Sequence, residues 1–268
     1  MTPGRSYFTR LGPNEHLPGR WCMGAWNTEE LHVAPVNGLL MHEYEHWSAG
    51  REPDGLVAGS IRFDYLGVID FTPCTVTWRV VRPGRAVELI EGVVEQHGRP
   101  VLRALMWRLA TAPTEIVAGG APDRLPPPDG CQAFDATAIW RGEYIGSLEF
   151  RSVTAGEPGD GVRWVRSPIE HVVAVEPSSP FTRWVLLADT CNGIAVRESP
   201  DEWQFPNLDL AVHLIRQPTG PWLGARVHVT FGPGGHGLTE AALYDLDGYV
   251  GSGTLGLLVR PQPNQPAT

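Results

Sequence analysis

The sequence contains no lysine, because all 21 of its basic residues are arginine. A Schiff-base mechanism needs a lysine amine, and a Walker-type phosphate loop needs a lysine after its glycines, so both are excluded. The sequence has 21 arginines and 30 acidic residues, so its formal net charge is −9. General nucleic-acid binders neutralise phosphates with an excess of positive charge, and we therefore expect no nucleic-acid partner.

Cysteine and long apolar runs are also scarce. The four cysteines are far apart and form no Cys-x-x-Cys pair, so neither structural zinc nor a disulfide framework is expected at Cys22, Cys74, Cys131 and Cys191. No apolar run approaches the length that spans a bilayer, and the first twenty residues lack the apolar core of a secretory signal. We therefore expect a cytoplasmic protein with reduced thiols and no membrane contact.

Length and composition indicate two packed units built from short strands. The chain has 268 residues, 42% of them hydrophobic and 19% charged, and its 31 glycines and 25 prolines indicate many turns. Residues 111–130 read TAPTEIVAGGAPDRLPPPDG, which is typical of a linker because proline and glycine disfavour a sheet interior. We expect an N-terminal domain, a linker, a C-terminal domain and a frayed tail, at 1–112, 113–130, 131–262 and 263–268.

The two halves follow the same plan, a helix and then a run of strands. Apolar positions at helical spacing predict one helix over 36–47 and another over 181–196. Strands are expected at 56–66, 75–81, 85–96, 100–109, 208–215, 222–231, 238–245 and 249–259. Aligning Asn37-Gly38 with Asn192-Gly193 matches helix to helix, so we predict an internal repeat whose two antiparallel meanders join into one sheet.

Four stretches of the chain resemble the double-hotdog acyl-CoA thioesterases, the thioesterase II-like group. They are WRVVRPGR at 78–85 with EQHG at 95–98, LADTCNG at 187–193, FPNLD at 205–209 with RQP at 216–218, and DGYVG at 247–251 with LV at 258–259. The resemblance implies an α+β tandem (double) hotdog, in which two long helices are each wrapped by half of a continuous antiparallel sheet. It also implies acyl-CoA as substrate, a role in fatty acid metabolism, no cofactor and, by analogy, a homodimer.

The resemblance further implies where the site lies. An aspartate on the second helix corresponds to Asp189, a hydroxyl or amide residue on the next strand to Asn207, and a glutamine on the last strand to Leu255. Leu255 departs from the family, since its side chain neither donates nor accepts a hydrogen bond. Thr254 is adjacent but faces the other side of a regular strand, so it would replace the glutamine only through a one-residue shift in register.

Asp189 also stands out without the resemblance. It follows the apolar run 185–188 in a helical pattern, where a carboxylate is costly to desolvate unless it is paired or catalytic. As a catalyst it would act as general base on water or attack the thioester itself, and Asn192 would share its helix face. The alternative is a helix N-cap, in which Asp189 accepts amide hydrogen bonds and a helix begins at Thr190.

Two glycines and three arginines are candidates for substrate binding, together with Asn192 and Leu255. Gly38 and Gly193 occupy matching positions in the predicted helices and would allow close approach of a ligand, the alternative being plain packing of helix on sheet. Arg82, Arg85 and Arg216 offer guanidinium groups for the phosphates of CoA, the alternative being a solvated surface.

One further pattern suggests a metal. Residues 42–46 read HEYEH, which matches the His-Glu-x-x-His pattern of zinc proteases by letter. A working zinc site also needs a third ligand and an open helix that lines a pocket, and the sequence indicates neither. We therefore expect no metal and interpret this segment as part of the first helix.

Two functions compete at this point. The first is hydrolysis of acyl-CoA thioesters to free acid and CoA, with water activated by Asp189. The second is a non-catalytic acyl or acyl-CoA-binding protein that keeps the binding tunnel but has a degenerate site, since Leu255 stands where the family has glutamine.

Overall fold

The computed structural model describes residues 5–263. The first half contains β1 (Ser6–Arg10), β2 (Glu15–Pro18), η1 (Arg20–Cys22), α1 (Val33–Ala49), β3 (Leu56–Tyr65), β4 (Cys74–Arg82), β5 (Val87–Gln96), β6 (Arg99–Ala110) and η2 (Glu115–Val117). The second half contains η3 (Pro128–Gly130), β7 (Gln132–Phe134), η4 (Ala136–Ala138), α2 (Glu143–Gly146), β8 (Glu149–Ser152), β9 (Asp160–Arg166), β10 (His171–Val173), α3 (Pro180–Ala188), α4 (Cys191–Ile194), β11 (Trp203–Gln204), β12 (Asp209–Leu214), β13 (Trp222–Phe231), β14 (His236–Asp245), β15 (Gly248–Leu258) and β16 (Arg260–Pro261).

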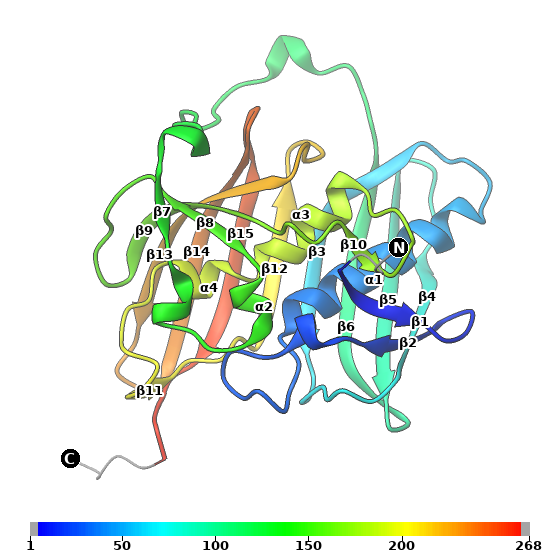
Figure 1. Ribbon diagram of the computed structural model, residues 1–268. Coiled ribbons are helices and arrows are strands. Elements are labelled where there is room, and N and C mark those ends of the chain that lie inside the picture. Colours follow the sequence, from blue (N-terminus) through cyan, green and yellow to red (C-terminus); the bar gives the residue numbers. More distant parts are fainter. Residues whose placement is uncertain (1–4, 264–268) are drawn as a thin grey trace.

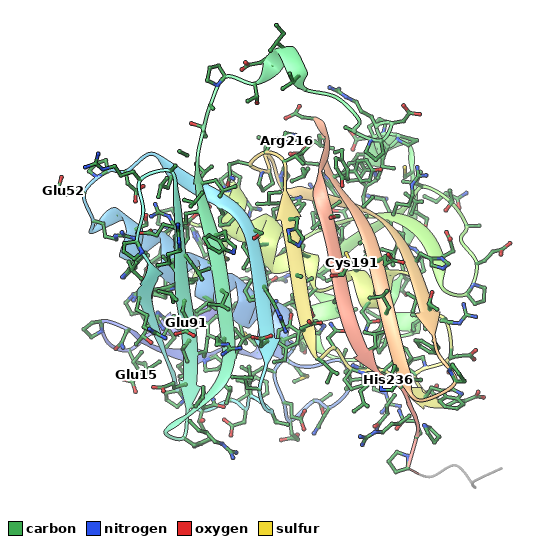
Figure 2. The ribbon with its side chains drawn as sticks, turned by 180° about the vertical axis from the view of Figure 1, so that it is seen from behind. Glu15, Glu52, Glu91, Cys191, Arg216 and His236 are labelled. Carbon is green, nitrogen blue, oxygen red and sulfur yellow. The ribbon has the colours of Figure 1, made fainter. Side chains whose placement is uncertain are left out.

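One 14-stranded sheet organises the molecule, in the order β10-β1-β2-β4-β5-β6-β3-β12-β15-β14-β13-β9-β8-β7. From the central pair β3 and β12, the order outward is β6, β5, β4, β2 on one side and β15, β14, β13, β9 on the other, so the two halves mirror each other. The helices lie together on one face of the sheet (Figure 1), and the view from behind looks onto the opposite face (Figure 2). This arrangement is the predicted double hotdog with a continuous sheet.

The eight predicted strands are confirmed to within two residues at each end. Six further strands of the large sheet, β1, β2, β7, β8, β9 and β10, were not predicted, since most of them are too short to show a clear period-2 pattern. Among them, β10 of the second half pairs in parallel with β1 of the first, with Ser6 opposite His171. Strands of the two halves therefore pair at one edge of the sheet as well as at its centre. The predicted domain boundaries stay a prediction.

The second helix is divided, whereas the sequence predicted one long helix over 181–196. Ser179 caps α3 by accepting a hydrogen bond from the Thr182 amide, and the helix ends at Ala188. Asp189 follows as its C-terminal cap, and Thr190 leads into the single turn of α4. The alternative in which Asp189 opens a helix as N-cap is wrong, because its side chain accepts hydrogen bonds from other side chains and from no amide of α4.

Gly38 lies where α1 crosses α3. A Cβ atom built on Gly38 would lie 2.6 Å from Leu186 Cδ1, closer than two carbon atoms tolerate. Close contact between the two helices thus explains the glycine. The two explanations offered from the sequence, close approach of a ligand and packing of the helix on the sheet, are not needed. Gly38 lies in the second turn of α1, whereas Gly193 lies beyond α3, so the sequence alignment that made these glycines equivalent has the wrong register.

This contact predicts the effect of Gly38→Ala on stability. Overpacking a tight contact costs about 1–3 kcal/mol, and alanine recovers about 1 kcal/mol through helix propensity. We therefore expect the free energy of unfolding to fall by about 1 kcal/mol in urea denaturation. In a double-mutant cycle, Leu186→Ala should relieve the cost of Gly38→Ala, and strictly additive effects would contradict the proposed contact.

The segment between the halves runs without strands from β6 to β7, through η2 and η3. Its end is docked, since the Trp164 indole donates to the Pro126 carbonyl at 2.8 Å. Of the predicted frayed tail, residues 264–268 lie outside the described residues. Within residues 5–263, no helix is long and apolar enough to cross a membrane. All four cysteines carry free thiols, as predicted.

Candidate active site

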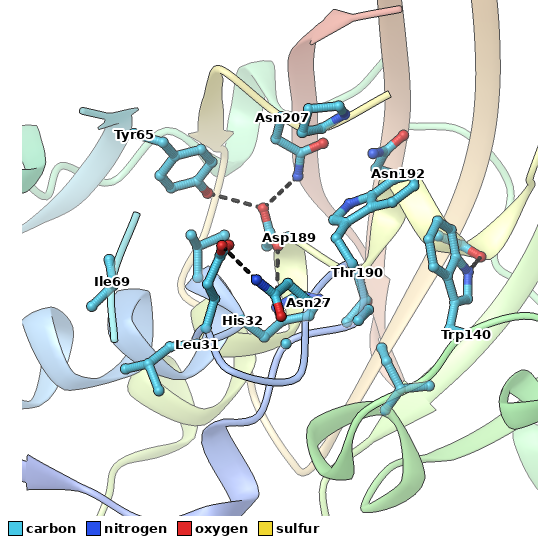
Figure 3. A pocket seen from close by; sticks show the side chains of 18 of the residues that line it. Asn27, Leu31, His32, Tyr65, Ile69, Trp140, Asp189, Thr190, Asn192 and Asn207 are labelled. Carbon is cyan, nitrogen blue, oxygen red and sulfur yellow. Dashed lines mark hydrogen bonds and ion pairs between the residues drawn. The ribbon is translucent and has the colours of Figure 1, made fainter. Parts of the chain in front are cut away.

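A cavity of about 400 Å³ opens where α1 begins, β3 ends and α3 ends. This volume lies in the range of about 300–1,000 Å³ that is typical of small-molecule sites. Its polar wall includes His32, Tyr65, Asp189, Asn192 and Asn207, together with Asn27, Glu30 and Thr190 (Figure 3). Its apolar wall includes Trp26, Leu31, Ile69, Trp140, Ile145 and Phe150. This arrangement suits a ligand that has a polar, reactive end and an apolar remainder, since each part would contact a matching wall of the cavity.

The strand pairing brings the polar groups together. Because β3 and β12 are antiparallel, with Asp64 opposite Asp209, the end of β3 lies beside the start of β12. The Tyr65 amide donates to the Leu208 carbonyl at 3.1 Å, which holds Tyr65 next to Asn207. The C-terminal end of α3 then places Asp189 between these two side chains (Figure 3).

Asp189 is held through one of its two carboxylate oxygens. The side chain is only 2% exposed, and its Oδ1 accepts hydrogen bonds from Tyr65 Oη at 2.9 Å and from Asn207 Nδ2 at 2.7 Å. Among the described residues, no group donates a hydrogen bond to Oδ2. The carboxylate therefore has a fixed orientation with one oxygen available to a ligand or to water.

Tyr65 is in turn positioned by α1. Asn37 Nδ2 donates to Tyr65 Oη at 2.9 Å, so the hydroxyl hydrogen is directed toward Asp189. Burial, together with the charge of Asp189, raises the pKa of Tyr65 well above its ordinary value. Tyr65 thus stays protonated at neutral pH and remains a donor to the carboxylate.

His32 lies on the other side of Asp189 and, as a neutral ring, forms neither a hydrogen bond nor an ion pair with it, although the two groups are close (dashed line in Figure 3). Its Nδ1 atom is 3.6 Å from Asp189 Oδ2 and accepts the Ala34 amide hydrogen at 3.2 Å, which caps α1. The hydrogen of the neutral ring therefore belongs on Nε2. Burial lowers the pKa of His32 below 6.5, although the charge of Asp189 works in the opposite direction. The imidazole is accordingly neutral at neutral pH.

A pH titration of His32 followed by NMR tests this arrangement. We expect the midpoint in the wild-type protein to lie below 6.5, because the buried ring is harder to protonate. In Asp189→Asn the midpoint should fall further, since the negative charge that favours the imidazolium is removed. A His32→Gln variant identifies the signal. A midpoint that stays unchanged or rises in Asp189→Asn would contradict the placement of these two groups.

Asn192 and Gly193 also line the cavity, and their contact with a substrate stays a prediction. Asn192, however, does not hold Asp189: its Nδ2 donates to the Phe205 carbonyl at 3.1 Å, and its Oδ1 lies 3.4 Å from Thr239 Oγ1. The Gly193 carbonyl accepts a hydrogen bond from the Trp140 indole at 3.2 Å. Both residues therefore shape the cavity wall and anchor the segment that follows Asp189.

The last strand does not bring its two candidates to the cavity. Leu255 is fully buried and lies opposite Thr239 on β14, whose hydroxyl contacts Asn192. Neither Leu255 nor Thr239 lines the cavity. Thr254 is exposed on the opposite face of the sheet, and β15 pairs regularly at this point, without the register shift that Thr254 would need.

The three arginines are likewise distant from the cavity. Arg82 and Arg85 are exposed at the far end of β4, where Arg82 pairs with Leu89, whereas the cavity lies at the Tyr65 end of the sheet. Arg216 follows the far end of β12, at the top of the sheet in Figure 2, and binds Asp245 through two nitrogens. None of these groups lines the cavity in the described chain.

Sequence reasoning missed Tyr65, His32 and Asn37. Tyr65 ends a strand that looks ordinary, and only the pairing of β3 with β12 brings it to Asp189, 124 residues away. His32 precedes the first residue of α1, so its role as helix cap was in principle visible. Asn37 was used only to align the two halves, although an amide within an apolar helical run is a signal of a buried polar contact.

The chain matches two family models, the acyl-CoA thioesterase N-terminal domain over residues 17–109 and the acyl-CoA thioesterase C-terminal domain over residues 122–257. It belongs to the acyl-CoA thioesterase family. The resemblance inferred from the sequence is thereby confirmed. No curated protein gives a match.

Solved structures agree with the family in fold. The chain is similar to acyl-CoA thioesterase II TesB2 from Mycobacterium marinum, at 16% identity with a TM-score of 0.65 over 96% of this chain and 97% of that one. It is also similar to the tesB protein of Mycobacterium avium subs paratuberculosis, at 12% identity and a TM-score of 0.67 over 95% and 96%. A hot dog fold protein from Alicyclobacillus acidocaldarius gives 14% identity and a TM-score of 0.71 over 97% and 96%. At these low identities, the similarity shows that this protein has the same fold as the three solved structures. The chemistry of its site must be argued from its own residues.

Proposed function

We propose that this protein hydrolyses acyl-CoA thioesters to free acid and CoA, with water activated by Asp189. One observation carries the proposal: a buried carboxylate in the wall of a ligand-sized cavity, fixed by Tyr65 and Asn207 through Oδ1 and open at Oδ2. The family supplies the substrate class. The residues Asn192 and Gly193 belong to the proposed binding wall, whereas Thr254 and the three arginines do not.

The reaction can be written with this chain's residues. A water molecule bound at Asp189 Oδ2 gives up a proton to the carboxylate while its oxygen adds to the thioester carbonyl carbon. The tetrahedral intermediate then collapses, the carbon–sulfur bond breaks, and the proton returns from Asp189 to the sulfur of CoA. Direct attack by Asp189 would instead form a mixed anhydride that a second step hydrolyses. The two hydrogen bonds to Oδ1 keep the carboxylate in place, which favours activation of water over direct attack by Asp189.

The start of α1 is suited to stabilise the carbonyl oxygen. Val33 lines the cavity, and among the described residues its amide has no hydrogen-bond acceptor. This amide lies at the positive end of the α1 dipole, where developing negative charge is favoured. The neutral His32 ring beside this amide adds no positive charge. The negative charge of the oxyanion would therefore be stabilised by the Val33 amide and by the dipole of α1.

The apolar wall is suited to an acyl chain. Trp26, Leu31, Ile69, Ile145 and Phe150 give the cavity a surface that favours hydrocarbon over water. The protein is also expected to act in fatty acid metabolism in the cytoplasm. By analogy with other hotdog proteins, we expect it to form a homodimer. These statements remain predictions.

The second function, binding of acyl-CoA without turnover, is favoured by Leu255. This buried apolar side chain stands where the family has glutamine, opposite Thr239 and close to Asn192. If the glutamine orients water or the oxyanion, its loss costs on the order of 10²–10³-fold in rate, by analogy with a missing oxyanion donor. Turnover in Leu255→Gln but not in the wild-type protein would favour this reading.

The experiment that separates the two functions is a thiol-release assay with acyl-CoAs of short, medium and long chain. Hydrolysis predicts release of CoA in proportion to the enzyme and a preference for one chain length. Binding alone predicts saturable acyl-CoA binding by calorimetry with no release above the buffer rate. Absence of both binding and turnover across the panel would contradict the proposed substrate class.

A further inference from the structure

A cluster of metal-ligating side chains lies outside the cavity of Asp189. His42 and His46 are one turn apart on α1, and Glu176 lies between β10 and α3. The two Nε2 atoms are 2.9 Å and 3.2 Å from the same carboxylate oxygen, Glu176 Oε2. The third ligand that the His-Glu-x-x-His segment lacked in the sequence is thus supplied from a position 130 residues further along the chain.

We propose that His42, His46 and Glu176 form a binding site for a divalent ion of the zinc class. Their ligand atoms all lie within 4.8 Å of one another, and ligands around a tetrahedral zinc ion at about 2.0–2.1 Å are about 3.3 Å apart, so only small side-chain movements are needed. Two imidazoles and one carboxylate are a recognised zinc ligand set that leaves a fourth position open. His46 is 55% exposed, so an ion can enter from solvent.

The surrounding charges favour a cation. Arg10 donates to both Glu43 and Glu176, at 2.6 Å and 2.7 Å, so one guanidinium balances two carboxylates. With neutral imidazoles this group carries a net charge of −1, which a divalent ion would reverse. Arg10 also bonds to Glu176 Oε2, the oxygen that faces the histidines, and would keep its bonds to Oε1 and Glu43 when that oxygen binds the ion. It then acts as an outer partner that orients the carboxylate.

The site is not that of a zinc protease, despite the matching letters. In that pattern the glutamate after the first histidine acts as the base on zinc-bound water. Here Glu43 Oε1 is occupied by Arg10 at 2.6 Å and lies 3.1 Å from the buried His16 ring. The glutamate that would act as the base is therefore already paired with Arg10, and we infer a binding role in which the metal ties α1 to the segment that leads into α3.

This inference is independent of the proposed hydrolysis. His42 is ten residues beyond His32 along α1, which corresponds to about 15 Å at the rise of an α-helix. An ion at His42 and His46 therefore does not touch the cavity at the helix start. Metal binding and thioester turnover can each fail without the other, and each is measured separately.

The test is a zinc titration of the full chain, after treatment with a chelator, against a chromophoric competitor. The variants are His46→Ala, whose side chain is half exposed, and Glu176→Gln. The matched control is His228→Ala, which removes an exposed histidine that lies 3.3 Å from Asp160 on another part of the sheet. Circular dichroism verifies that each variant is folded.

We expect one zinc ion per chain in the wild-type protein and in His228→Ala. His46→Ala should bind more than about tenfold more weakly, since even loss of an outer partner costs about 10–100-fold in affinity. Zinc should also raise the Tm of the wild-type protein but not that of His46→Ala. Absence of binding, or equal affinity in the wild-type protein and His46→Ala, would overturn the proposal and leave the cluster as a hydrogen-bond network.

Discussion

Asp189→Asn is expected to lower kcat for acyl-CoA hydrolysis by about 10²–10⁴-fold, the usual contribution of a positioned general base. The amide has nearly the shape of the carboxylate and can still accept a hydrogen bond from Tyr65, so the cavity is retained. It cannot take a proton from water. KM should therefore change little while kcat falls, because the lost interaction is made in the transition state.

The matched control for this prediction is Asp209→Asn. Asp209 lies at the start of β12, and its carboxylate accepts the Gly256 amide hydrogen at 2.8 Å without lining the cavity. The same chemical change at this position should leave kcat within about twofold of wild type. Thiol release is followed for both variants under saturating acyl-CoA. Equal rates for the wild-type protein and Asp189→Asn would remove Asp189 from the mechanism.

Arg216→Leu is expected to reduce the free energy of unfolding by about 3 kcal/mol, because it leaves a buried carboxylate without its charge partner. Asp245 has a fully buried side chain and receives two hydrogen bonds from the Arg216 guanidinium, one of them at 2.6 Å. Its carboxylate also accepts the backbone amides of Thr219 and Asp247. These contacts close the turn between β14 and β15, so their loss weakens the second half of the sheet.

The comparison variant is Arg85→Leu, at an exposed arginine that does not line the cavity of Asp189. It should change the free energy of unfolding by no more than about 0.5 kcal/mol. Denaturation in urea measures both variants, and KM for acyl-CoA should be unchanged in each. A higher KM with unchanged stability in Arg216→Leu would instead restore the CoA-phosphate role that the sequence suggested.

The same pair predicts a pH dependence of stability. Burial by itself would raise the pKa of Asp245, but the bonds from Arg216 and the two amides hold it below the ordinary value of 3.8. A depressed folded-state pKa stabilises the protein above the unfolded value, and this stability is lost as the pH falls below about 4. Stability should therefore fall between pH 5 and 3 more steeply in the wild-type protein than in Arg216→Leu.

The repeating part of the fold was predictable because it depends on local periodicity. Long strands such as β13, whose burial alternates from Ala225 to Thr230, have bounds that follow from the sequence alone. Short edge strands such as β2 carry too few residues for a pattern, and they form because the larger sheet offers an edge to pair with. The break at Asp189 escaped prediction because the apolar spacing continues through it. The side-chain bonds of Asp189 and the bond from the Thr190 amide to the Leu187 carbonyl are visible only in the folded chain.

The candidate site was predictable in part. Asp189 was found because a carboxylate within an apolar run is unusual, and Asn207 because of the resemblance to the family. Tyr65 and Asn37 were not found, since the bond from Tyr65 to Asp189 and the bond from Asn37 to Tyr65 join segments that meet only in the folded chain. The family resemblance suggested Leu255 and a shift in register suggested Thr254, but neither residue lines the cavity, and Thr254 lies on the exposed face of β15.

The central claim is that the thioester lies in the cavity beside Asp189, and a crystal structure of Asp189→Asn soaked with a long-chain acyl-CoA tests it most directly. The account predicts the thioester carbonyl in this cavity, with its oxygen within hydrogen-bond distance of the Val33 amide and its acyl chain along Ile69 and Phe150. Acyl-CoA bound instead in the second hollow, between the C-terminal half of α1 and the start of β3 at Leu56, would contradict it.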